Sequence, residues 1–441
     1  MKKIYASAFF CLCAAAMSIN AQTQFVLSPL ECDNFELSLY AESISENQNF
    51  VAGQDQSCSC PVIWNTVTGD VVRLTDNEMF YDEESQTPYT ENYTGTFHSV
   101  NSNGLAVGEF GAPSDCSHAI MCDINNPEDY ILLYEEDSDA GNAAYAISED
   151  GSTIVGFHFD ANWVTYGCVW TNGGQTRTDL PWPTAEQCGF EIDYASARGM
   201  SADGSVIMGY VQDYNYGSWV FICWERQADG TYICNTDACQ KDFEYDYQLG
   251  KPDMVFEPHN ISGNGEWVTL EVEAEFDPWD WNYTPSQRAA RLNVKTNELQ
   301  VLDQEGSVFG IANNGTAVGR VTDASWANQA VIWMADEAEL TSLTDLLPEV
   351  GELNDAFDTA LCNITSDATA ATGVCINALD VEPYYAQQSF VASLPGGQDN
   401  PVSISQLEKI VKQGVSYDIQ GRRTYNTRGR LTIIDGRKVI K

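Results

Sequence analysis

The strongest constraint on the fold is a ten-residue motif that the chain repeats. ISEDGSTIVG begins at Ile147, and a near copy, MSADGSVIMG, begins at Met200. Seven copies share an apolar first residue, a polar turn and an apolar run, and consecutive copies lie 47 to 61 residues apart. They begin at Ile44, Val100, Ile147, Met200, Ile261, Ile311 and Ile364. Units of this size cannot bury their own apolar faces, so they must pack on one another to form a core.

The turn of each copy predicts a tight hairpin between two strands. Asn-Gly and Asp-Gly between apolar runs favour such turns because both residue types tolerate a positive φ. Six copies end on a glycine, which indicates a strand whose backbone is crowded by a neighbour. These closing glycines are Gly53, Gly108, Gly156, Gly209, Gly319 and Gly373, and Leu270 takes this position in the fifth copy.

A second apolar block follows every copy, for example PVIW from Pro61 and AVIW from Ala330. Ten residues after this block, five units carry a leucine, which predicts a third hairpin: Leu74, Leu132, Leu180, Leu302 and Leu343. Each unit thus supplies four short strands in a meander. Seven such units predict an all-β fold, a seven-bladed β-propeller of four-stranded antiparallel blades. A two-sheet sandwich would explain the alternating strands but not seven copies in one register, and a solenoid is the other alternative.

The seventh unit runs out of sequence before its fourth strand. Residues 25–30 (FVLSPL) precede the first unit and have no other role in the pattern. We therefore expect this segment to supply the outer strand that the seventh unit lacks.

The units resemble the extracellular HAF-type repeats of a β-propeller family of Bacteroidetes. That pattern runs G-I-(S/N)-x-x-G-x-x-V-G, then H-A-F-x-W, then a late leucine. Residues 117–120 (SHAI) match its His-Ala part, and four tryptophans take its tryptophan position: Trp64, Trp170, Trp224 and Trp333. The resemblance covers most of residues 41–394 and implies fold and export rather than chemistry. The fifth unit lacks the closing glycine and the tryptophan, and the seventh lacks the tryptophan and the late leucine.

Charge and composition divide the chain into three expected parts. Residues 1–21, with two lysines, an apolar run and Ala21 at the end, read as a signal peptide. Residues 22–396 are the predicted propeller, and residues 397–441 form a basic tail. Residues 22–400 carry 10 basic and 61 acidic side chains, whereas residues 401–441 carry nine and three. Such an acidic body excludes nucleic acid as a partner, and no apolar stretch is long enough for a transmembrane helix.

The tail reads SYDIQGRRTYNTRGRLTIIDGRKVIK from Ser416. It resembles the C-terminal sorting domain of Por-type secretion in Bacteroidetes, in which Y-D-x-x-G-R-(R/K) precedes a glycine-rich hairpin and a lysine-rich end. The matching residues are Tyr417, Asp418, Gly421, Arg422, Arg423, Gly436, Arg437, Lys438 and Lys441. The resemblance implies the export machinery as a partner and a secreted protein, extracellular or on the outer cell surface, with the periplasm as the alternative. The aromatic residue usual before the second strand is missing from GRLTII. A small basic β-module that packs on the acidic body is the other interpretation.

Twelve of the 14 cysteines lie beyond residue 21, an even number that predicts disulfides in an exported chain. Cys362 and Cys375 flank a predicted hairpin, and we expect them to pair across it. Cysteine spacing typical of zinc sites is absent.

Aromatic residues are unevenly shared between the two faces expected of the disc. The turns between first and second strands contain none, whereas the loops between second and third strands on the opposite face contain many. We predict an aromatic, acidic ligand-binding face formed by Trp163, Tyr214, Tyr216, Trp279, Trp281, Tyr283, Trp326, Tyr384 and Tyr385. Aromatic rings beside carboxylates suit a glycan or a cationic peptide. Alternatively, these rings only pack within their own loops.

One further position varies in chemistry from unit to unit. It lies two residues before the start of each copy, and its occupants are Glu42, His98, Tyr145, Arg198, His259, Phe309 and Cys362. These side chains either ring a central channel or cap the first strand, and we favour the cap.

No catalytic residue is predicted. HExxH, GxSxG, P-loop and dinucleotide motifs are absent, and no carboxylate pair stands out among so many acids. No cofactor is expected. Calcium is the metal that the acidic stretches from Asp76 and Glu135 would suit, but neither has the spacing of an EF-hand, and no metal ligand is assigned.

The sequence therefore predicts a secreted or cell-surface binding protein that recognises glycans or peptides on the aromatic, acidic face of a propeller. A propeller glycoside hydrolase or lyase is one alternative. A structural surface protein without a ligand is the other.

Overall fold

The computed structural model describes residues 25–394 and four strands between residues 416 and 440. Its gaps in the first range are residues 30, 33–34, 83–86, 114–115, 137–139, 189, 214–217, 236–252, 256–257, 275–285, 323–326, 347–355 and 379–384. The chain divides into two compact units, residues 25–395 and residues 1–24 with 396–441. The helices of the described part are short: η1 (Pro127–Asp129), α2 (Ala185–Cys188) and α3 (Leu343–Leu346). Among the described residues, no helix has the length and apolar character needed to cross a bilayer.

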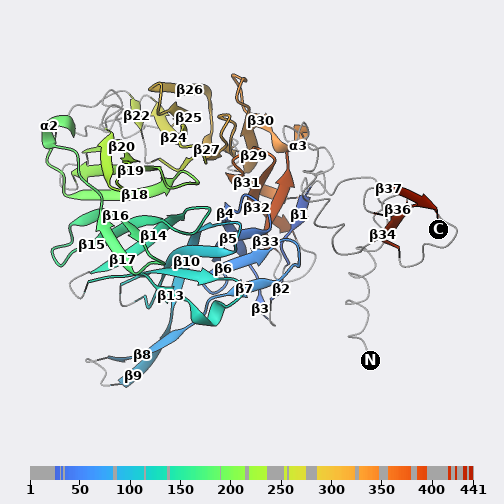
Figure 1. Ribbon diagram of the computed structural model, residues 1–441, viewed down its shortest axis with the longest axis horizontal. Helices are drawn as coiled ribbons and strands as arrows, with labels where there is room; N and C mark the ends of the chain where they lie inside the picture. Colours follow the sequence, from blue (N-terminus) through green and yellow to red (C-terminus); the bar gives the residue numbers. More distant parts are fainter. Residues whose placement is uncertain are drawn as a thin grey trace. The chain divides into compact units, whose positions relative to one another are not determined.

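The larger unit consists mainly of antiparallel sheets of four strands, which we number one to seven in chain order, with one eight-stranded sheet counted as sheets three and four (Figure 1). Sheet one consists of β4 (Leu39–Ile44), β5 (Phe50–Asp55), β6 (Cys60–Asn65) and β7 (Val71–Arg73). Sheet two consists of β10 (Thr94–Val100), β11 (Leu105–Gly111), β12 (His118–Asp123) and β13 (Ile131–Leu132). Sheet three consists of β14 (Gly141–Ile147), β15 (Ile154–Phe159), β16 (Thr165–Thr171) and β17 (Thr176–Asp179). Sheet four consists of β18 (Tyr194–Met200), β19 (Val206–Asp213), β20 (Ser218–Arg226) and β21 (Tyr232–Asn235). One parallel pair, Thr165 with Tyr194, connects sheets three and four.

The remaining three sheets follow the same order with two variations. In sheet five, β22 (Asp253–Val255) and β23 (Asn260–Ile261) both pair with β24 (Trp267–Ala274), which β25 (Ser286–Asn293) and β26 (Glu298–Glu305) follow. Sheet six consists of β27 (Ser307–Ile311), β28 (Ala317–Thr322), β29 (Asn328–Trp333) and β30 (Thr341–Ser342). Sheet seven consists of β31 (Ala356–Ile364), β32 (Ala370–Ala378), β33 (Tyr385–Ser393) and, from the other end of the unit, β1 (Phe25–Leu27).

The pairing of β1 with β33 confirms the strand expected from residues 25–30. The two strands are antiparallel, with Phe25 opposite Ala392 and Leu27 opposite Phe390. Just beyond β1, the buried hydroxyl of Ser28 accepts a hydrogen bond from the Ser389 amide at 3.1 Å. The start of the unit is thus tied to its end.

The repeated turns are built by their own polar side chains. In sheet three, Ser148 Oγ donates to Asp150 Oδ1 at 2.7 Å and accepts from the Thr153 amide at 3.0 Å. Gly151 completes this turn with a φ of +74°. Gln48 and Ala368, at φ of 63° and 59°, take the left-handed position in the first and seventh turns without glycine. In these two turns Ser45 donates to Asn47 and Thr365 donates to Asp367, so a hydroxyl residue followed by Asn or Asp directs the turn even where the glycine is missing.

Apolar cores lie between consecutive sheets rather than within one sheet. In one such cluster, Val169 and Leu180 of sheet three pack with Ala197 and Ile222 of sheet four. In another, Ala370 and Val391 of sheet seven join the apolar residues of sheet one. The four tryptophans of the repeats are at most 2% exposed: Trp64, Trp170, Trp224 and Trp333. Neighbouring repeats thus bury each other's faces, as their size required.

One late leucine was placed one residue too early. Leu132 is 51% exposed, whereas Leu133 is 2% exposed and belongs to the core between sheets two and three. The Leu133 amide donates to Ala119 O, just as the Leu180 amide donates to Gly167 O in sheet three. The 3-10 turn η1 adds a residue to this connection and shifts the leucine by one.

The predicted disulfide between Cys362 and Cys375 is wrong. Cys375 lies opposite Thr359 in the β31–β32 ladder, so Cys362 is displaced from it by three residues along the strand. Among the described residues, the structure has a disulfide between Cys58 and Cys60 at the start of β6.

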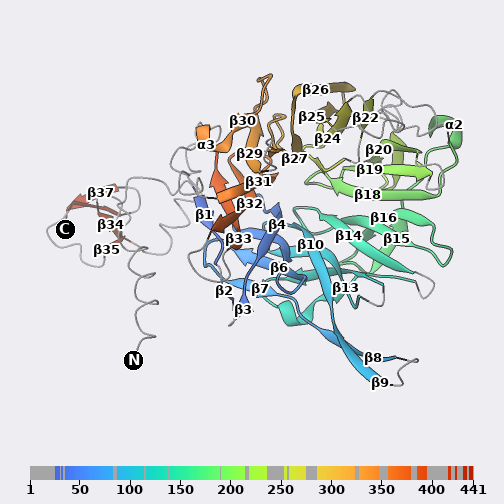
Figure 2. The same ribbon diagram turned by 180° about the vertical axis from the view of Figure 1, so that it is seen from behind.

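Three smaller features complete the description. β8 (Asn77–Asp82) and β9 (Thr87–Asn92) form a hairpin that extends away from the seven sheets in both views (Figures 1 and 2). β2 (Glu31–Cys32) pairs with β3 (Phe35–Glu36). In the second compact unit, β34 (Ser416–Asp418), β35 (Arg423–Thr424), β36 (Leu431–Ile434) and β37 (Arg437–Ile440) form an antiparallel sheet.

Candidate functional site

The closing glycines allow two strands to approach very closely. A Cβ atom on Gly156 would lie 2.0 Å from the carbonyl oxygen of Ala143, and one on Gly53 would lie 1.9 Å from that of Tyr40. The same collision arises at Gly108, Gly209, Gly319 and Gly373. The crowding predicted at these glycines is therefore confirmed, because no other residue leaves room for the neighbouring backbone.

Opposite each closing glycine, the first strand of the sheet carries a β-bulge. In sheet three, Ala144 pairs with Gly156 and Ala146 with Val155, so the register passes over Tyr145. A bulge of this kind redirects the side chain of its extra residue. The residues passed over in six sheets are Glu42, His98, Tyr145, Arg198, Phe309 and Cys362.

Sheet five reaches a similar arrangement by another route. Leu270 replaces the closing glycine, and the first strand is divided into β22 and β23. His259 lies immediately before β23, and its amide donates to Thr269 O at 3.0 Å. His259 therefore takes the place that the bulge residue has in the other sheets.

All seven of these residues line one cavity with a volume of about 470 Å³. This volume lies within the range of roughly 300–1,000 Å³ that is usual for small-molecule sites. The sequence favoured a strand cap at this position, but the shared cavity supports the alternative interpretation, in which these side chains face a common space. The cavity walls combine aromatic rings with one arginine, one glutamate and two histidines.

His98 lies between two carboxylates. Its Nδ1 atom is 3.0 Å from Glu42 Oε2, and its Nε2 atom is 4.0 Å from Glu109 Oε1. The ring also lies 4.7 Å from the ring of Tyr145. A carboxylate that accepts the Nδ1 hydrogen fixes the orientation of the imidazole. Nε2 makes no hydrogen bond with the described residues, so one hydrogen-bonding position of the ring remains open.

Arg198 is held against two tyrosines. Its guanidinium carbon lies 4.3 Å from the ring centre of Tyr145 and 5.5 Å from that of Tyr210. Nη2 donates to Tyr210 Oη at 3.0 Å, and Tyr210 Oη in turn donates to Tyr194 Oη at 3.4 Å. Stacking and cation–π attraction thus hold a flat array of donors at the cavity wall.

The opposite wall is formed by sheets five to seven. His259 Nε2 lies 3.5 Å from Glu271 Oε2, and its ring contacts Phe309 edge to face at 5.2 Å. The side chains of Cys362 and Tyr40 are hydrogen-bonded to each other. Burial, followed by the nearby Glu42 carboxylate, raises the pKa of the Cys362 thiol to about 12. This wall therefore presents a neutral thiol rather than a thiolate nucleophile.

The partners of the cavity residues come from a second position that sequence reasoning missed. In sheets two to six, the residue just after the closing glycine, or after Leu270, contacts the cavity residue of the same sheet. The five pairs are His98 with Glu109, Tyr145 with Phe157, Arg198 with Tyr210, His259 with Glu271, and Phe309 with Arg320. The repeat itself carried the signal, since this position varies in chemistry from copy to copy just as the bulge position does.

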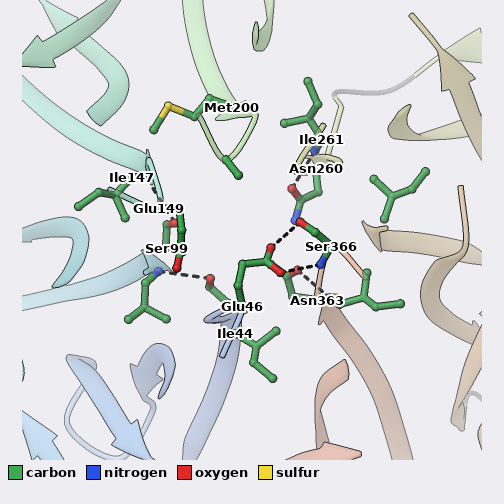
Figure 3. Close-up of a pocket in the computed structure, with 16 residues that line it drawn as sticks. Ile44, Glu46, Ser99, Ile147, Glu149, Met200, Asn260, Ile261, Asn363 and Ser366 are labelled. Carbon is green, nitrogen blue, oxygen red and sulfur yellow. Dashed lines mark hydrogen bonds between the residues drawn. The ribbon is translucent and has the colours of Figure 1, made fainter. Parts of the chain in front are cut away.

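At its inner end the cavity adjoins a narrower one of about 90 Å³ (Figure 3). Its walls include the first residue of every repeat: Ile44, Val100, Ile147, Met200, Ile261, Ile311 and Ile364. Glu46 and Glu149, from the turns that follow, line it as well. The varied bulge position thus lines the larger cavity, and the first apolar residue of each repeat lines the smaller one, which we call the constriction.

The turns around this constriction are hydrogen-bonded from one sheet to the next. The Glu149 amide donates to Ala202 O at 2.8 Å, and the Ala202 amide donates to Gly263 O at 2.9 Å. Ser366 of sheet seven donates its amide to Glu46 Oε2 of sheet one at 2.9 Å (Figure 3). The other links run from Asn47 to Ser102, Ser102 to Glu149, Asn264 to Asn313 and Asn313 to Ser366. Burial raises the pKa of Glu46, although both bonds from Ser366 oppose this shift.

Of the nine aromatic residues predicted to bind a ligand, Trp163 is the one whose side chain the structure describes. It lies between β15 and β16 and is 67% exposed. Tyr385 begins β33. The other seven lie outside the described residues: Tyr214, Tyr216, Trp279, Trp281, Tyr283, Trp326 and Tyr384. A shared aromatic face is therefore still a prediction.

Asp55, Cys58 and Cys60 are the described residues whose ligand atoms lie close enough together to hold a metal ion. Both sulfur atoms belong to the disulfide, however, and the Asp55 carboxylate is paired with Arg73 and accepts from the amides of Ser38 and Ser57. These groups already satisfy one another, so the cluster does not fit a metal site.

No protein-family model and no curated protein matches the chain. Solved structures do match, among them hydrazine synthase of Kuenenia stuttgartiensis, with 11% identity, a TM-score of 0.41 and coverage of 81% of this chain and 96% of that one. The β-propeller domain of Cps50 (Swd1) from Myceliophteria thermophila shows 10% identity, a TM-score of 0.38 and coverage of 81% and 97%. Oligogalacturonate lyase of Vibrio parahaemolyticus shows 11% identity, a TM-score of 0.34 and coverage of 74% and 98%. Similarities this distant carry no conclusion about chemistry.

Proposed function

We propose that this chain is a secreted seven-bladed β-propeller that binds a glycan in the cavity lined by its bulge residues. The observation that carries the proposal is the convergence of seven chemically different side chains, one from each sheet, on a cavity of about 470 Å³. A scaffold that only needed to be stable would gain nothing from varying this position while keeping its turns and glycines alike.

Three features support a closed ring of seven blades. Apolar cores lie between consecutive sheets, including sheets seven and one. The turns at the constriction are linked by hydrogen bonds around all seven sheets, and Ser366 with Glu46 completes the circuit. β1 supplies the outer strand of sheet seven. We further propose membership of the HAF-type repeat proteins and export through the C-terminal sorting tail to the extracellular space or outer cell surface, on the motifs quoted above.

Among possible ligands, the wall chemistry favours a glycan. Sugar rings combine apolar faces with many hydroxyl groups, which suit stacked tyrosines beside carboxylate, imidazole and guanidinium groups. Arg198 at the wall opposes a cationic peptide end. The formal net charge of −43 repels polyanions, so a neutral glycan fits best.

A glycan array probed with the full chain tests this function. Wild type should bind a subset of neutral glycans, and Arg198→Leu should lose at least tenfold in affinity because the hydrogen-bond donors are gone. Tyr89→Ala, in the projecting hairpin, removes an aromatic ring outside the cavity and should bind as wild type does. If only cationic peptides bound, the proposal of a glycan ligand would be wrong and a peptide ligand would take its place. If no ligand bound, the interpretation as a structural surface protein would remain.

The His98–Glu42 contact also fits a second function, that of a propeller glycoside hydrolase or lyase. A carboxylate that orients an imidazole prepares it for proton transfer, which both reactions need. Release of shortened or unsaturated products from a bound glycan, abolished by His98→Gln, would establish this activity. Binding without turnover, retained in the same variant, would exclude it for the glycans tested.

A further inference from the structure

We infer that the cavity receives the terminal unit of a glycan chain and that Trp163 contacts a unit further out along the same chain. This inference rests on the proposed glycan binding and adds to it the part of the ligand that is recognised. Two observations carry it, the constriction at the inner end of the cavity and a row of aromatic rings that leads out of it.

The small volume at the constriction disfavours passage of a chain through the cavity. The space lined by the seven apolar residues is about 90 Å³, against about 470 Å³ for the cavity, and is well below the volume of a small-molecule site. The hydrogen-bonded turns behind these residues hold the constriction together. A sugar in the cavity can therefore continue only outward, which restricts the site to a chain end.

Four aromatic residues of sheet three form a continuous row from the cavity to the surface. The ring of Tyr145, at the cavity wall, lies 5.8 Å from that of Phe157, and Phe157 lies 5.1 Å from Phe159. Phe159 lies 5.8 Å from Trp163. Edge and stacked contacts of this kind fix the rings relative to one another. Trp163 is therefore the outermost ring of this row, on the side where the second-to-third-strand loop of sheet three leaves the sheet.

The backbone of Trp163 is held in a conformation that a tryptophan seldom adopts. Its φ is +65°, in the left-handed region that disfavours bulky side chains. Its amide donates to Asp160 O at 3.0 Å, and Asp160 Oδ1 accepts from the amides of Asn162 and Val164 at 2.8 and 2.9 Å. This turn keeps a large apolar ring 67% exposed at a cost in backbone strain. A ring in contact with a sugar would account for that cost.

The test uses the full chain and linear oligosaccharides of one to six units made of the neutral sugars that bind on the array. Calorimetric titration should give one protein bound per chain at every length, because the reducing and non-reducing ends differ in chemistry and the cavity accepts one of them. The affinity should be higher for chains of two or three units than for a single sugar. Trp163→Ala should lower the affinity for the longer chains by about five- to tenfold, while its affinity for the single sugar stays as in wild type. Trp163→Phe should restore most of it.

The controls separate this inference from the proposed function. Tyr89→Ala should follow wild type at all lengths, and melting curves of each variant report whether it folds. An affinity that keeps rising in proportion to the number of units would show recognition of internal units and overturn the inference. Equal loss of affinity for one sugar and for longer chains in Trp163→Ala would also overturn it. In both cases glycan binding stands, whereas failure of every neutral glycan to bind wild type overturns the function and the inference together.

Discussion

The imidazole of His98 lies 3.0 Å from the carboxylate of Glu42, and each of the two is the extra residue of a β-bulge in a different sheet. Two independent distortions of strand geometry thus meet at one hydrogen bond. Both depend on a glycine in the strand beside them.

The glycine of sheet two gives the first prediction. A methyl group at Gly108 would lie 1.8 Å from Thr96 O, so Gly108→Ala must force β10 and β11 apart. We expect a loss of about 3 kcal/mol in unfolding free energy, measured by urea denaturation. Gly69→Ala is the control, because its φ is +80° but nothing lies within 4 Å of the added methyl group. It should lose about 1 kcal/mol, and an equal loss in both variants would contradict the account.

The second prediction concerns the strand that joins the two ends of the larger unit. Deleting residues 25–30 removes the partner of β33 together with Ser28, whose hydroxyl satisfies the buried Ser389 amide. The melting temperature should fall by several degrees, and Ser28→Ala alone should cost about 1–3 kcal/mol. Val26→Thr, at a side chain 38% exposed, should leave the melting temperature almost unchanged. An unaltered melting curve for the deletion would show that β1 is dispensable.

A buried arginine between sheets five and six gives the third prediction. Arg291 is 3% exposed and donates to Gly315 O at 2.6 Å and to Ala335 O at 2.7 Å. Arg291→Ala should cost about 3 kcal/mol or more because it leaves buried carbonyl groups without donors, and Arg291→Lys should recover only part of it. The control is Arg288→Ala, since the contact of Arg288 with Asp303 is solvent-exposed and should contribute about 1 kcal/mol or less. Similar losses at both positions, in urea denaturation, would refute this role.

The fourth prediction is a pH dependence at the constriction. The pKa of Glu46 is raised by burial above its ordinary value of 4.5, so the folded chain binds this proton more readily than the unfolded chain. Its contribution to stability therefore grows as pH falls from 7 towards that value, and is lost as pH rises through the folded pKa. Glu46→Gln cannot titrate, so its melting temperature should gain less than that of wild type between pH 7 and pH 5. Glu128→Gln, at an exposed position, accounts for the change in net charge. Parallel curves for wild type and Glu46→Gln would count against a raised pKa.

Much of the fold could be predicted because it depends on interactions between residues that are close in the sequence. The bonds among Ser148, Asp150 and Thr153 lie within six residues, so the turn can be recognised in the sequence wherever it recurs. The fixed spacing of ten residues predicts Leu132 instead of Leu133, because it does not allow for the extra residue that η1 adds to this connection. Local patterns thus locate the strands but not every length between them.

The site was harder to predict for a related reason. The position of Glu42 and His98 could be recognised in the repeat, but the direction of its side chain depends on a bulge. A bulge changes the face of the strand from which a side chain projects. The pairing of Cys362 with Cys375 failed for another reason, since it assumed that residues flanking a hairpin lie opposite each other, whereas Cys375 lies opposite Thr359. The bulge lies opposite a closing glycine at which an added Cβ would collide with a carbonyl oxygen. This collision becomes apparent only when the position of the opposite strand is known.

The separation of turn, glycine and bulge within each repeat has a practical consequence. The residues that hold the scaffold together and the residues that face the cavity are different residues, one set nearly constant and the other already holding glutamate, histidine, tyrosine, arginine, phenylalanine and cysteine. The seven cavity positions can therefore be substituted without changing the residues that determine the fold. A library randomised at those positions alone would be a route to receptors of new specificity.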